Sequence, residues 1–323
     1  MDILMVCPLR PGTTKNGRDL GEAFAAEGLS VGYFDYDLGP LLLSLVPKPM
    51  RGDWYDPKRD GYVNEGLFEM IRRHRPRVVF CVKARCIRQD TLERIRRAGI
   101  RTAGYWIDDP LLFEESMKNA LYYDLYFTND KSSVEAYRSR GVEVLHLPSA
   151  ASPQHFFPMR VRKRYDVSFV GTCSGGRQER LAVIRSSTVD TFGPGWRKKA
   201  PYGVRSHREV FGDRTNRVYN ESRINLNLHT WFGVGSAMNL RLFEVPLAGQ
   251  FLLTDWISEI DGEFEPGRHI EIWRTPEELD DKIRFYLAKP ESAERIGAAG
   301  REHVLSRHTY RNRVQIIRNI IRI

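Results

Sequence analysis

Arg241 and Glu244 are two charged residues whose types and spacing suit the binding of an anionic ligand. Residues three positions apart share one face of a helix, so the two side chains would project together. The planar guanidinium of Arg241 suits a phosphate, and the carboxylate of Glu244 can accept hydrogen bonds from both hydroxyls of a ribose. An ordinary surface ion pair between the two is the alternative interpretation.

The surrounding sequence predicts the elements that position this pair. Apolar residues alternate over 224–228 as in a strand, Gly233 and Gly235 then break the chain, and the apolar positions of 240–247 follow a helical period. Residues 251–253 are expected to form a second, parallel strand. In such a βαβ unit, ligands lie beyond the carboxyl ends of the strands, where the start of the helix offers N–H groups to a phosphate. The other polar residues expected at this end are Asn227, His229 and Asn239.

A second glycine-rich turn follows the strand expected over 166–170. Gly171 and Thr172 open this turn, and Arg177 lies where the next helix is expected to start. The order strand, glycine loop, helix favours an anion-binding nest. The turn lacks the Gly-Lys-Ser/Thr of a Walker loop, so ATP hydrolysis is not predicted. Arg177 is therefore a candidate for binding an anion, with an exposed first-turn arginine as the alternative.

Two pairs of carboxylates could provide acid–base or metal chemistry. Asp108 and Asp109 follow the strand expected over 102–107, and burial with mutual repulsion would raise the pKa of one of them toward a range suited to taking a proton from a hydroxyl. We favour Asp108, because Asp109 precedes a proline and could instead cap the next helix. Asp35 and Asp37 match the Asp-x-Asp pattern of some metal-dependent enzymes, but such short matches are frequent by chance and we expect no metal.

The whole chain alternates short apolar strands with helices, the pattern of a parallel α/β protein. It opens as a Rossmann-type βαβ unit without a true Gly-x-Gly-x-x-Gly, since Gly17 and Gly21 are too far apart. A length of 323 residues is enough for two domains that each bury a core. The basic stretch 160–164 is the expected linker between them.

The pattern Asn239-Leu-Arg241-Leu-Phe-Glu244 resembles the carboxyl-terminal signature of the CgeB-like (spore maturation protein) glycosyltransferases, which belong to the two-domain GT-B class. The resemblance covers about the last 160 residues of the chain. The other segments that carry it are Ala248-Gly249, Leu252–Asp255, Phe264–Gly267, Pro276–Leu279, Ala298–His303 and His308–Arg311.

The resemblance implies two Rossmann-like domains facing a central cleft. Residues 1–155 would form the acceptor-side domain, residues 156–307 the donor domain, and residues 308–323 a helix that returns to the first domain. The activity implied is metal-independent transfer of a sugar from a nucleoside diphosphate-sugar to a hydroxyl of a protein, a lipid-linked glycan or a polysaccharide. We expect a UDP-sugar first, with dTDP- and GDP-sugars as alternatives, and no other cofactor.

The resemblance also gives the candidate residues their roles. The loop that includes Thr14, Asn16 and Gly17 would line the cleft, and Trp196 could stack on the nucleotide base. Asp108 and His229 are the candidates for catalysis. The donor-binding candidates are Gly171, Thr172, Arg177, Asn227, Asn239, Arg241 and Glu244.

One departure from the class leaves the reaction open. The best-known retaining GT-B enzymes carry a Glu eight positions before the ribose-binding Glu, and that position here is Ser236. Neither retention nor inversion is therefore predicted, and His229 could be either a donor to the leaving phosphate or a structural histidine. The missing Glu motivates a second hypothesis, a catalytically silent protein that binds a sugar nucleotide or a glycan on the same fold.

Composition limits the partners. The 50 Lys and Arg against 41 Asp and Glu give a net charge of +9, which would permit nucleic acid, but the basic clusters are dispersed and no aromatic nucleic-acid module is present. We expect no nucleic-acid partner. The apolar stretch 41–46 is too short to span a bilayer, and the chain opens directly into a strand, so we expect a cytoplasmic protein with reduced cysteines. A homodimer or a peripheral membrane contact stays compatible with the sequence.

Overall fold

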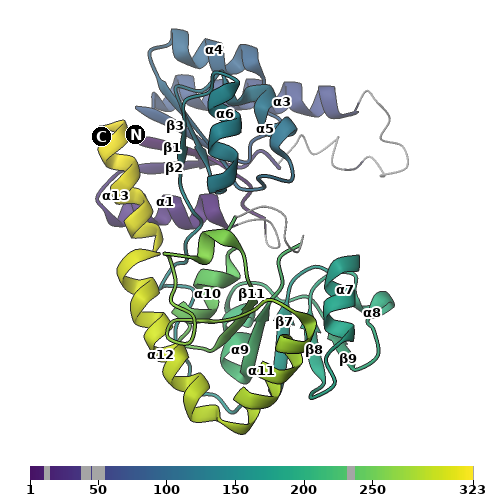
Figure 1. The fold of residues 1–323 in the computed structure, drawn as a ribbon. Coiled ribbons are helices and arrows are strands. Elements are labelled where there is room, and N and C mark those ends of the chain that lie inside the picture. Colours follow the sequence, from purple (N-terminus) through teal and green to yellow (C-terminus); the bar gives the residue numbers. More distant parts are fainter. Residues whose placement is uncertain (11–14, 38–44, 46–54, 231–236, 323) are drawn as a thin grey trace. The chain divides into compact units, whose positions relative to one another are not determined.

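The computed structural model describes residues 1–10, 15–37, 45, 55–230 and 237–322. They form two compact units, one made of residues 1–148 and 313–323 and the other of residues 149–312 (Figure 1). The boundaries expected from the sequence were 155/156 and 307/308. The observed boundaries, 148/149 and 312/313, differ from these. Ala151 and Thr309, which were expected outside the donor domain, pair with each other in a parallel β-bridge and both belong to the second unit.

The first unit is a parallel six-stranded sheet in the order β2-β1-β3-β4-β5-β6. Its central strands are mostly apolar and buried on both faces, as parallel strands between two helical layers are, whereas the edge strands β2 and β6 are partly exposed. All five residues of Val78–Val82, for example, are buried. The described elements are β1 (Ile3–Val6), α1 (Asn16–Ala26), β2 (Val31–Phe34), α3 (Tyr55–His74), β3 (Val78–Val82), α4 (Gln89–Arg97), β4 (Arg101–Trp106), α5 (Phe113–Ala120), β5 (Leu125–Thr128), η2 (Lys131–Ser133), α6 (Val134–Ser139) and β6 (Val144–His146).

The last helix, α13 (Tyr310–Ile321), belongs to this first unit from Arg313 onward. Arg313 Nε donates to the carbonyl of Pro148 at 2.8 Å, and Arg101 Nη1 donates to the carbonyl of Ile321 at 2.6 Å. Arg318 lies 3.5 Å from a carboxylate oxygen of Glu27, just beyond α1. The predicted return of the final helix to the amino-terminal sheet is confirmed by these contacts.

The second unit is another parallel six-stranded sheet, in the order β12-β11-β10-β7-β8-β9. The chain runs outward from β7 to β9, crosses back, and continues on the other side of β7 from β10 to β12, which is the doubly wound Rossmann order. Its elements are β7 (Tyr165–Val170), α7 (Gly175–Ala182), β8 (Val189–Phe192), α8 (Trp196–Lys199), β9 (Val204–His207), α9 (Asp213–Glu221), β10 (Ser222–Asn227), α10 (Arg241–Leu247), β11 (Leu252–Asp255), η3 (Ser258–Ile260), β12 (Glu271–Trp273), α11 (Pro276–Ala288) and α12 (Pro290–Arg307).

Two apolar clusters hold the helices to the second sheet. One contains Leu181 of α7 and Ile283 of α11 with Phe169 of β7. The other contains Phe243 of α10 and Val304 of α12. Gly249 ends α10 with a positive φ of 72°, a left-handed conformation that favours glycine at a helix end. Both faces of this sheet are therefore covered.

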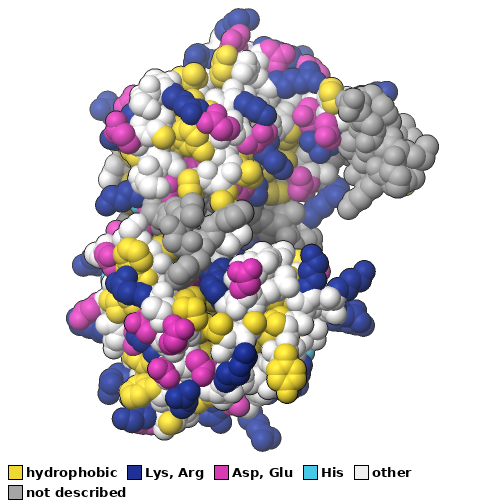
Figure 2. All heavy atoms as spheres, turned by 45° about the vertical axis from the view of Figure 1, so that its right-hand side comes forward, with side chains coloured by type: hydrophobic (Ala, Val, Ile, Leu, Met, Phe, Trp, Pro, Cys, Tyr) yellow, Lys and Arg dark blue, Asp and Glu magenta, His cyan; other side chains and the backbone are white. Residues whose placement is uncertain are grey.

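Charged side chains are interspersed over the face drawn in Figure 2, where Lys and Arg do not merge into one continuous patch. Basic and acidic side chains are therefore mixed on this face, although the chain as a whole carries a net charge of +9. None of the helices that the structure describes has the length and apolar composition needed to cross a bilayer. The four cysteines are free thiols, and burial raises the pKa of Cys7, Cys81 and Cys86 to about 12.

Candidate functional site

The candidate site lies where β7 and β10 are neighbours in the second sheet. The connection from β7 leads outward to β8, and the connection from β10 leads the other way to β11, so the loops diverge at the carboxyl ends of these two strands. This is the topological switch point at which open α/β sheets bind ligands. The residues that follow the two strands are Gly171 and Thr172 after β7, and Leu228, His229 and Thr230 after β10.

Arg241 joins the ends of the two strands. Its Nη1 donates to the carbonyl of Val170 at 3.0 Å, its Nη2 to the carbonyl of Leu228 at 3.4 Å, and its Nε to Asn227 Oδ1 at 2.7 Å. Burial lowers the pKa of this guanidinium. The side chain is thus held by protein acceptors at three of its five N–H groups. Its other two N–H groups have no acceptor among the described residues.

Arg177 approaches the same strand end from α7. Its Nε donates to the carbonyl of Leu228 at 3.0 Å, its Nη1 to that of Thr172 at 2.9 Å, and its Nη2 to Thr230 Oγ1 at 3.2 Å. Arg177 is only 7% exposed, so the alternative of an exposed first-turn arginine is wrong. Burial, with the nearby charges of Arg241 and Arg180, lowers the pKa of Arg177 to about 9.

Both guanidiniums also lie near one aromatic ring. The Cζ of Arg177 is 5.3 Å and that of Arg241 5.2 Å from the ring centroid of Phe169, a distance at which the ring face attracts a cation. Every acceptor that binds these two arginines is a neutral oxygen, and within the described residues neither guanidinium has an ion pair. The strand ends therefore hold two cations without a direct counter-charge.

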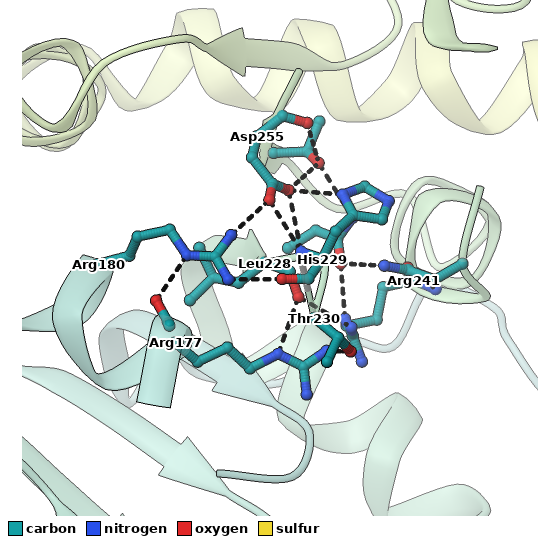
Figure 3. Close-up of polar contacts among 11 residues, drawn as sticks. Arg177, Arg180, Leu228, His229, Thr230, Arg241 and Asp255 are labelled. Atoms are coloured by element: carbon teal, nitrogen blue, oxygen red, sulfur yellow. Dashed lines mark hydrogen bonds and ion pairs between the residues drawn. The ribbon is translucent and has the colours of Figure 1, made fainter. Parts of the chain in front are cut away.

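A third arginine does have a counter-charge. Arg180 Nη1 donates to Asp255 Oδ2 at 2.7 Å, and Asp255 also accepts from Nδ1 of His229 at 2.7 Å and from its backbone N–H at 2.9 Å (Figure 3). Asp255 is fully buried; burial would raise its pKa, but His229 and Arg180 outweigh this and hold the pKa below its usual value. With Nδ1 engaged by the carboxylate, Nε2 of His229 is buried and has no hydrogen-bond partner in the described chain. The ring is thus fixed with one nitrogen available.

Asn227 positions the neighbouring polar groups. Its Oδ1 accepts from Asn239 Nδ2 at 2.9 Å as well as from Arg241, and its Nδ2 donates to Thr254 Oγ1 at 3.0 Å. Asn227 is fully buried, so we assign it a positioning role rather than direct ligand contact. Asn239 Oδ1 in turn accepts from the backbone N–H of Arg241 at 3.1 Å.

Glu244 lies on the same short helix and is 8% exposed, which excludes the ordinary surface ion pair considered above. Its Oε2 accepts from the hydroxyl of Tyr219 at 3.1 Å. Gly171 is glycine because a Cβ there would lie 2.9 Å from the Phe169 ring and 3.1 Å from Arg241 Nη1. Trp196 donates its indole N–H to the carbonyl of Gly171 at 2.7 Å and is fully buried, so the expectation that it stacks on a base is wrong.

The candidate acids of the first unit separate into two environments. Asp109 is buried, and its Oδ2 accepts from Thr128 at 2.6 Å and from Tyr137 at 2.9 Å. Burial raises the pKa of Asp109 to about 6. Asp109 does not cap the next helix, because α5 begins at Phe113 with Leu112 as its cap residue.

Asp108, in contrast, has a side chain that is 27% exposed and lies 2.5 Å from Lys83 Nζ. Lys83 follows β3 and adopts a φ of 53°, a backbone conformation that non-glycine residues rarely take and that is found more often at functional sites. The partly exposed Asp108 is therefore the carboxylate of this pair that a substrate could reach.

The first loop is only partly described. Thr14 lies outside the described residues, as do Gly233, Gly235 and Ser236. Asn16 and Gly17 are the first residues of α1 and both are buried. A Cβ at Gly17 would lie 2.3 Å from the Cβ of Cys7, so close packing of the helix on β1 already explains this glycine. Asp35 Oδ1 likewise accepts from the N–H of Asp37 at 2.9 Å in a local turn.

Comparison with known proteins identifies the architecture. Residues 177–319 match the model of a family described as "Glycosyl transferase-like". The fold is similar to that of sucrose-phosphate synthase from Thermosynechococcus elongatus, with a TM-score of 0.73 and 11% identity over 100% of this chain and 98% of that one. The chain therefore has the GT-B fold, and the part of it from residue 177 to residue 319 is similar to the glycosyl transferase-like family.

Other solved structures share this GT-B fold. The Anabaena protein HepE in complex with UDP is similar at a TM-score of 0.62 and 12% identity, over 99% of each chain. A putative UDP-N-acetylglucosamine 2-epimerase from Listeria monocytogenes is similar at 0.61 and 11% identity, over 98% of this chain and 95% of that one. A comparison with curated proteins finds no match. At these identities the likeness establishes the fold alone, so the reaction has to be inferred from the residues of this chain.

Proposed function

We propose that this chain transfers a sugar from a UDP-sugar to a hydroxyl acceptor, with the diphosphate bound by Arg177 and Arg241. The observation that carries the proposal is that, among the described residues, these two largely buried guanidiniums bind only neutral oxygens. Burying a charge without a counter-ion is unfavourable. A diphosphate at the switch point would supply the missing negative charge.

Several findings support a UDP-sugar as the donor. The family match covers the part of the chain that contains Arg177, Arg241 and Glu244. HepE, which has the same fold, has been crystallised with UDP, with UDP and glucose, and with UDP-glucose. We infer a UDP-hexose as the first donor to test, with Glu244 near the ribose, and we place the chain in the CgeB-like group on the sequence pattern of residues 239–255.

The proposed mechanism relies on fixed charges. As the glycosidic bond breaks, negative charge grows on the leaving diphosphate, and guanidiniums already held by backbone carbonyls stabilise that charge without having to reorganise. In this proposal they do the work that a divalent cation does in metal-dependent transferases. His229, held by Asp255, can present Nε2 to the leaving phosphate or to the sugar, and Asp108 is the proposed base for the acceptor hydroxyl.

The decisive experiment combines binding with turnover on the wild-type protein. UDP and UDP-glucose binding would be measured by calorimetry, and release of UDP would be followed with and without EDTA, using a panel of hydroxyl acceptors. The proposal predicts UDP binding and turnover that EDTA does not remove. Binding without any turnover would instead support the catalytically silent protein, and conversion of the sugar without transfer would point to an epimerase. Absence of UDP binding would refute the proposed donor.

A further inference from the structure

A cavity of about 250 Å³ lies at the amino ends of the strands of the second sheet. Arg177 and Arg241 lie at the opposite, carboxyl ends of these strands. Three of the residues that line the cavity mark the amino ends: Lys163 precedes β7 by two residues, Arg223 is the second residue of β10, and Phe251 directly precedes β11. The strands are parallel, so their amino ends lie together at the edge away from the switch point. The cavity is therefore separate from the proposed donor site and lies wholly within the second unit.

Buried apolar groups provide one part of the lining. Phe251, Tyr286 and Ala293 are all less than 9% exposed, and the two aromatic rings lie with their centroids 4.3 Å apart. Met159 and Val161 add apolar side chains from the segment that leads into β7. A flat apolar group would find matching surface on these residues.

Positive charge provides the other part. Lys163 Nζ donates to the carbonyl of Ser222 at 2.7 Å and to Gln250 Oε1 at 2.6 Å, two neutral acceptors that use two of its three N–H groups. Within the described residues Lys163 has no ion pair. Burial lowers the pKa of Lys163 to about 8; Glu294 opposes this shift and Arg223 adds to it.

The remaining charges at the cavity nearly balance. Arg223 is paired with Asp166 at 3.1 Å, and Glu294 is an exposed carboxylate at the rim. Removing Glu294 would leave the cavity with cations alone, so this residue limits how strongly an anion is attracted. Lys163 keeps one N–H group with no acceptor among the residues that the structure describes.

We propose that this cavity binds a small aromatic or alicyclic acid, whose carboxylate or phosphate accepts from Lys163 while its ring lies against Phe251 and Tyr286. The volume is slightly below the range of roughly 300–1,000 Å³ typical of drug-sized ligands, which suits a single ring with one anionic group. Such a ligand would be a regulator or a second substrate-like molecule, since the cavity is at the edge of the sheet opposite the proposed diphosphate site.

Calorimetry with three ring compounds tests the proposal. Phenyl phosphate, benzoate and the neutral benzyl alcohol would be titrated into the wild-type protein, Lys163→Met and the control Lys58→Met, which removes the same charge from an exposed position of the other unit. UDP in excess would keep the anions from the arginines. We expect at least one of the two acids to bind, benzyl alcohol not to bind, and Lys163→Met to weaken the acid about tenfold through the lost charged hydrogen bond. The stronger of the two acids identifies the anionic group.

Two results would overturn the proposal: no binding of either acid to the wild-type protein, or equal binding to Lys163→Met. If Lys163→Met does not fold, Glu294→Gln serves instead, because Glu294 is exposed and its loss leaves Lys163 in place. This variant should bind the acid roughly threefold more tightly, as expected for loss of a partly screened like charge. Unchanged or weaker binding to Glu294→Gln would exclude a ligand anion at this cavity. None of these outcomes depends on glycosyl transfer, so the proposal can fail while the proposed function stands.

Discussion

Replacing Arg177 by Met should weaken UDP binding without destabilising the free protein. Arg177 uses three of its five N–H groups on neutral acceptors, which leaves two for a phosphate. A hydrogen bond to a charged group contributes about 1.5–3 kcal/mol, so losing one should raise the Kd for UDP about 10- to 150-fold. This perturbation isolates the group on which the proposed donor site depends.

The free protein is expected to respond differently. The three lost hydrogen bonds contribute about 1 kcal/mol each. Against this, the lowering of the pKa of Arg177 from 12.5 to about 9 corresponds to roughly 5 kcal/mol of unfavourable burial and of repulsion by Arg241 and Arg180, which Met removes. The variant without ligand should therefore be as stable as the wild type, or up to about 2 kcal/mol more stable.

Calorimetry checks the expected loss of UDP affinity, and urea unfolding with and without UDP checks the expected stability. At a UDP concentration of about 100 times the wild-type Kd, the ligand should stabilise the wild type by about 2.7 kcal/mol and a variant that binds 50-fold more weakly by only about 0.6 kcal/mol. Arg197→Met, an exposed arginine of α8, removes the same charge and should change neither quantity. Unaltered UDP affinity in Arg177→Met would refute the placement of the diphosphate, and a loss of stability above about 3 kcal/mol would refute the charge-burial argument.

Three further predictions concern other groups. Asp108→Asn should slow transfer by about 10²- to 10⁴-fold, the usual contribution of a general base, and leave the Kd for UDP unchanged. An unchanged rate in steady-state kinetics, or a changed Kd in calorimetry, would contradict this prediction. Asp255→Asn should lower the free energy of unfolding by about 3–5 kcal/mol because it leaves the buried Arg180 without its carboxylate, and a smaller loss in urea titration would mean that water reaches the site. Burial lowers the pKa of His269 and His303 below 6.5, so their neutral forms contribute stability that is present above pH 6.5 and is lost as the pH falls through the lowered values. The free energy of unfolding, measured from pH 7.5 to 5, should show this decline, and His303→Gln should make the decline smaller.

The fold was largely predictable from the sequence because its signals are local. Continuous apolar runs such as 78–82 and 251–253 predicted buried parallel strands, and the glycine at 249 marked the end of α10. The two-domain GT-B architecture was implied by the family resemblance of the carboxyl-terminal half, and it is confirmed by the two six-stranded sheets. Domain boundaries were less accurate because they depend on the bridge between Ala151 and Thr309, a pairing of residues far apart in the chain.

The site was only partly predictable. The sequence indicated Arg177 and Arg241 separately, but not that both donate to the carbonyl of Leu228. The pair of Arg180 and Asp255 was missed, since the two residues are 75 positions apart and no local spacing connects them. The available signals were weak: Arg180 stands three residues after Arg177 on one helix face, and Asp255 ends a strand beside the candidate site. The side chain of Trp196 was misplaced because burial of an aromatic residue depends on packing that the sequence alone does not show.

The contacts of Arg241 have a consequence for engineering. One side chain joins the two halves of the doubly wound sheet, through the carbonyls of Val170 and Leu228, and also offers its remaining N–H groups to the proposed donor. Substitutions of Arg241 intended to change the choice of donor would therefore also remove the contact between the two halves of the sheet. Thr172, whose side chain is exposed beside the same strand end, is the place where donor preference could be varied while the sheet stays intact.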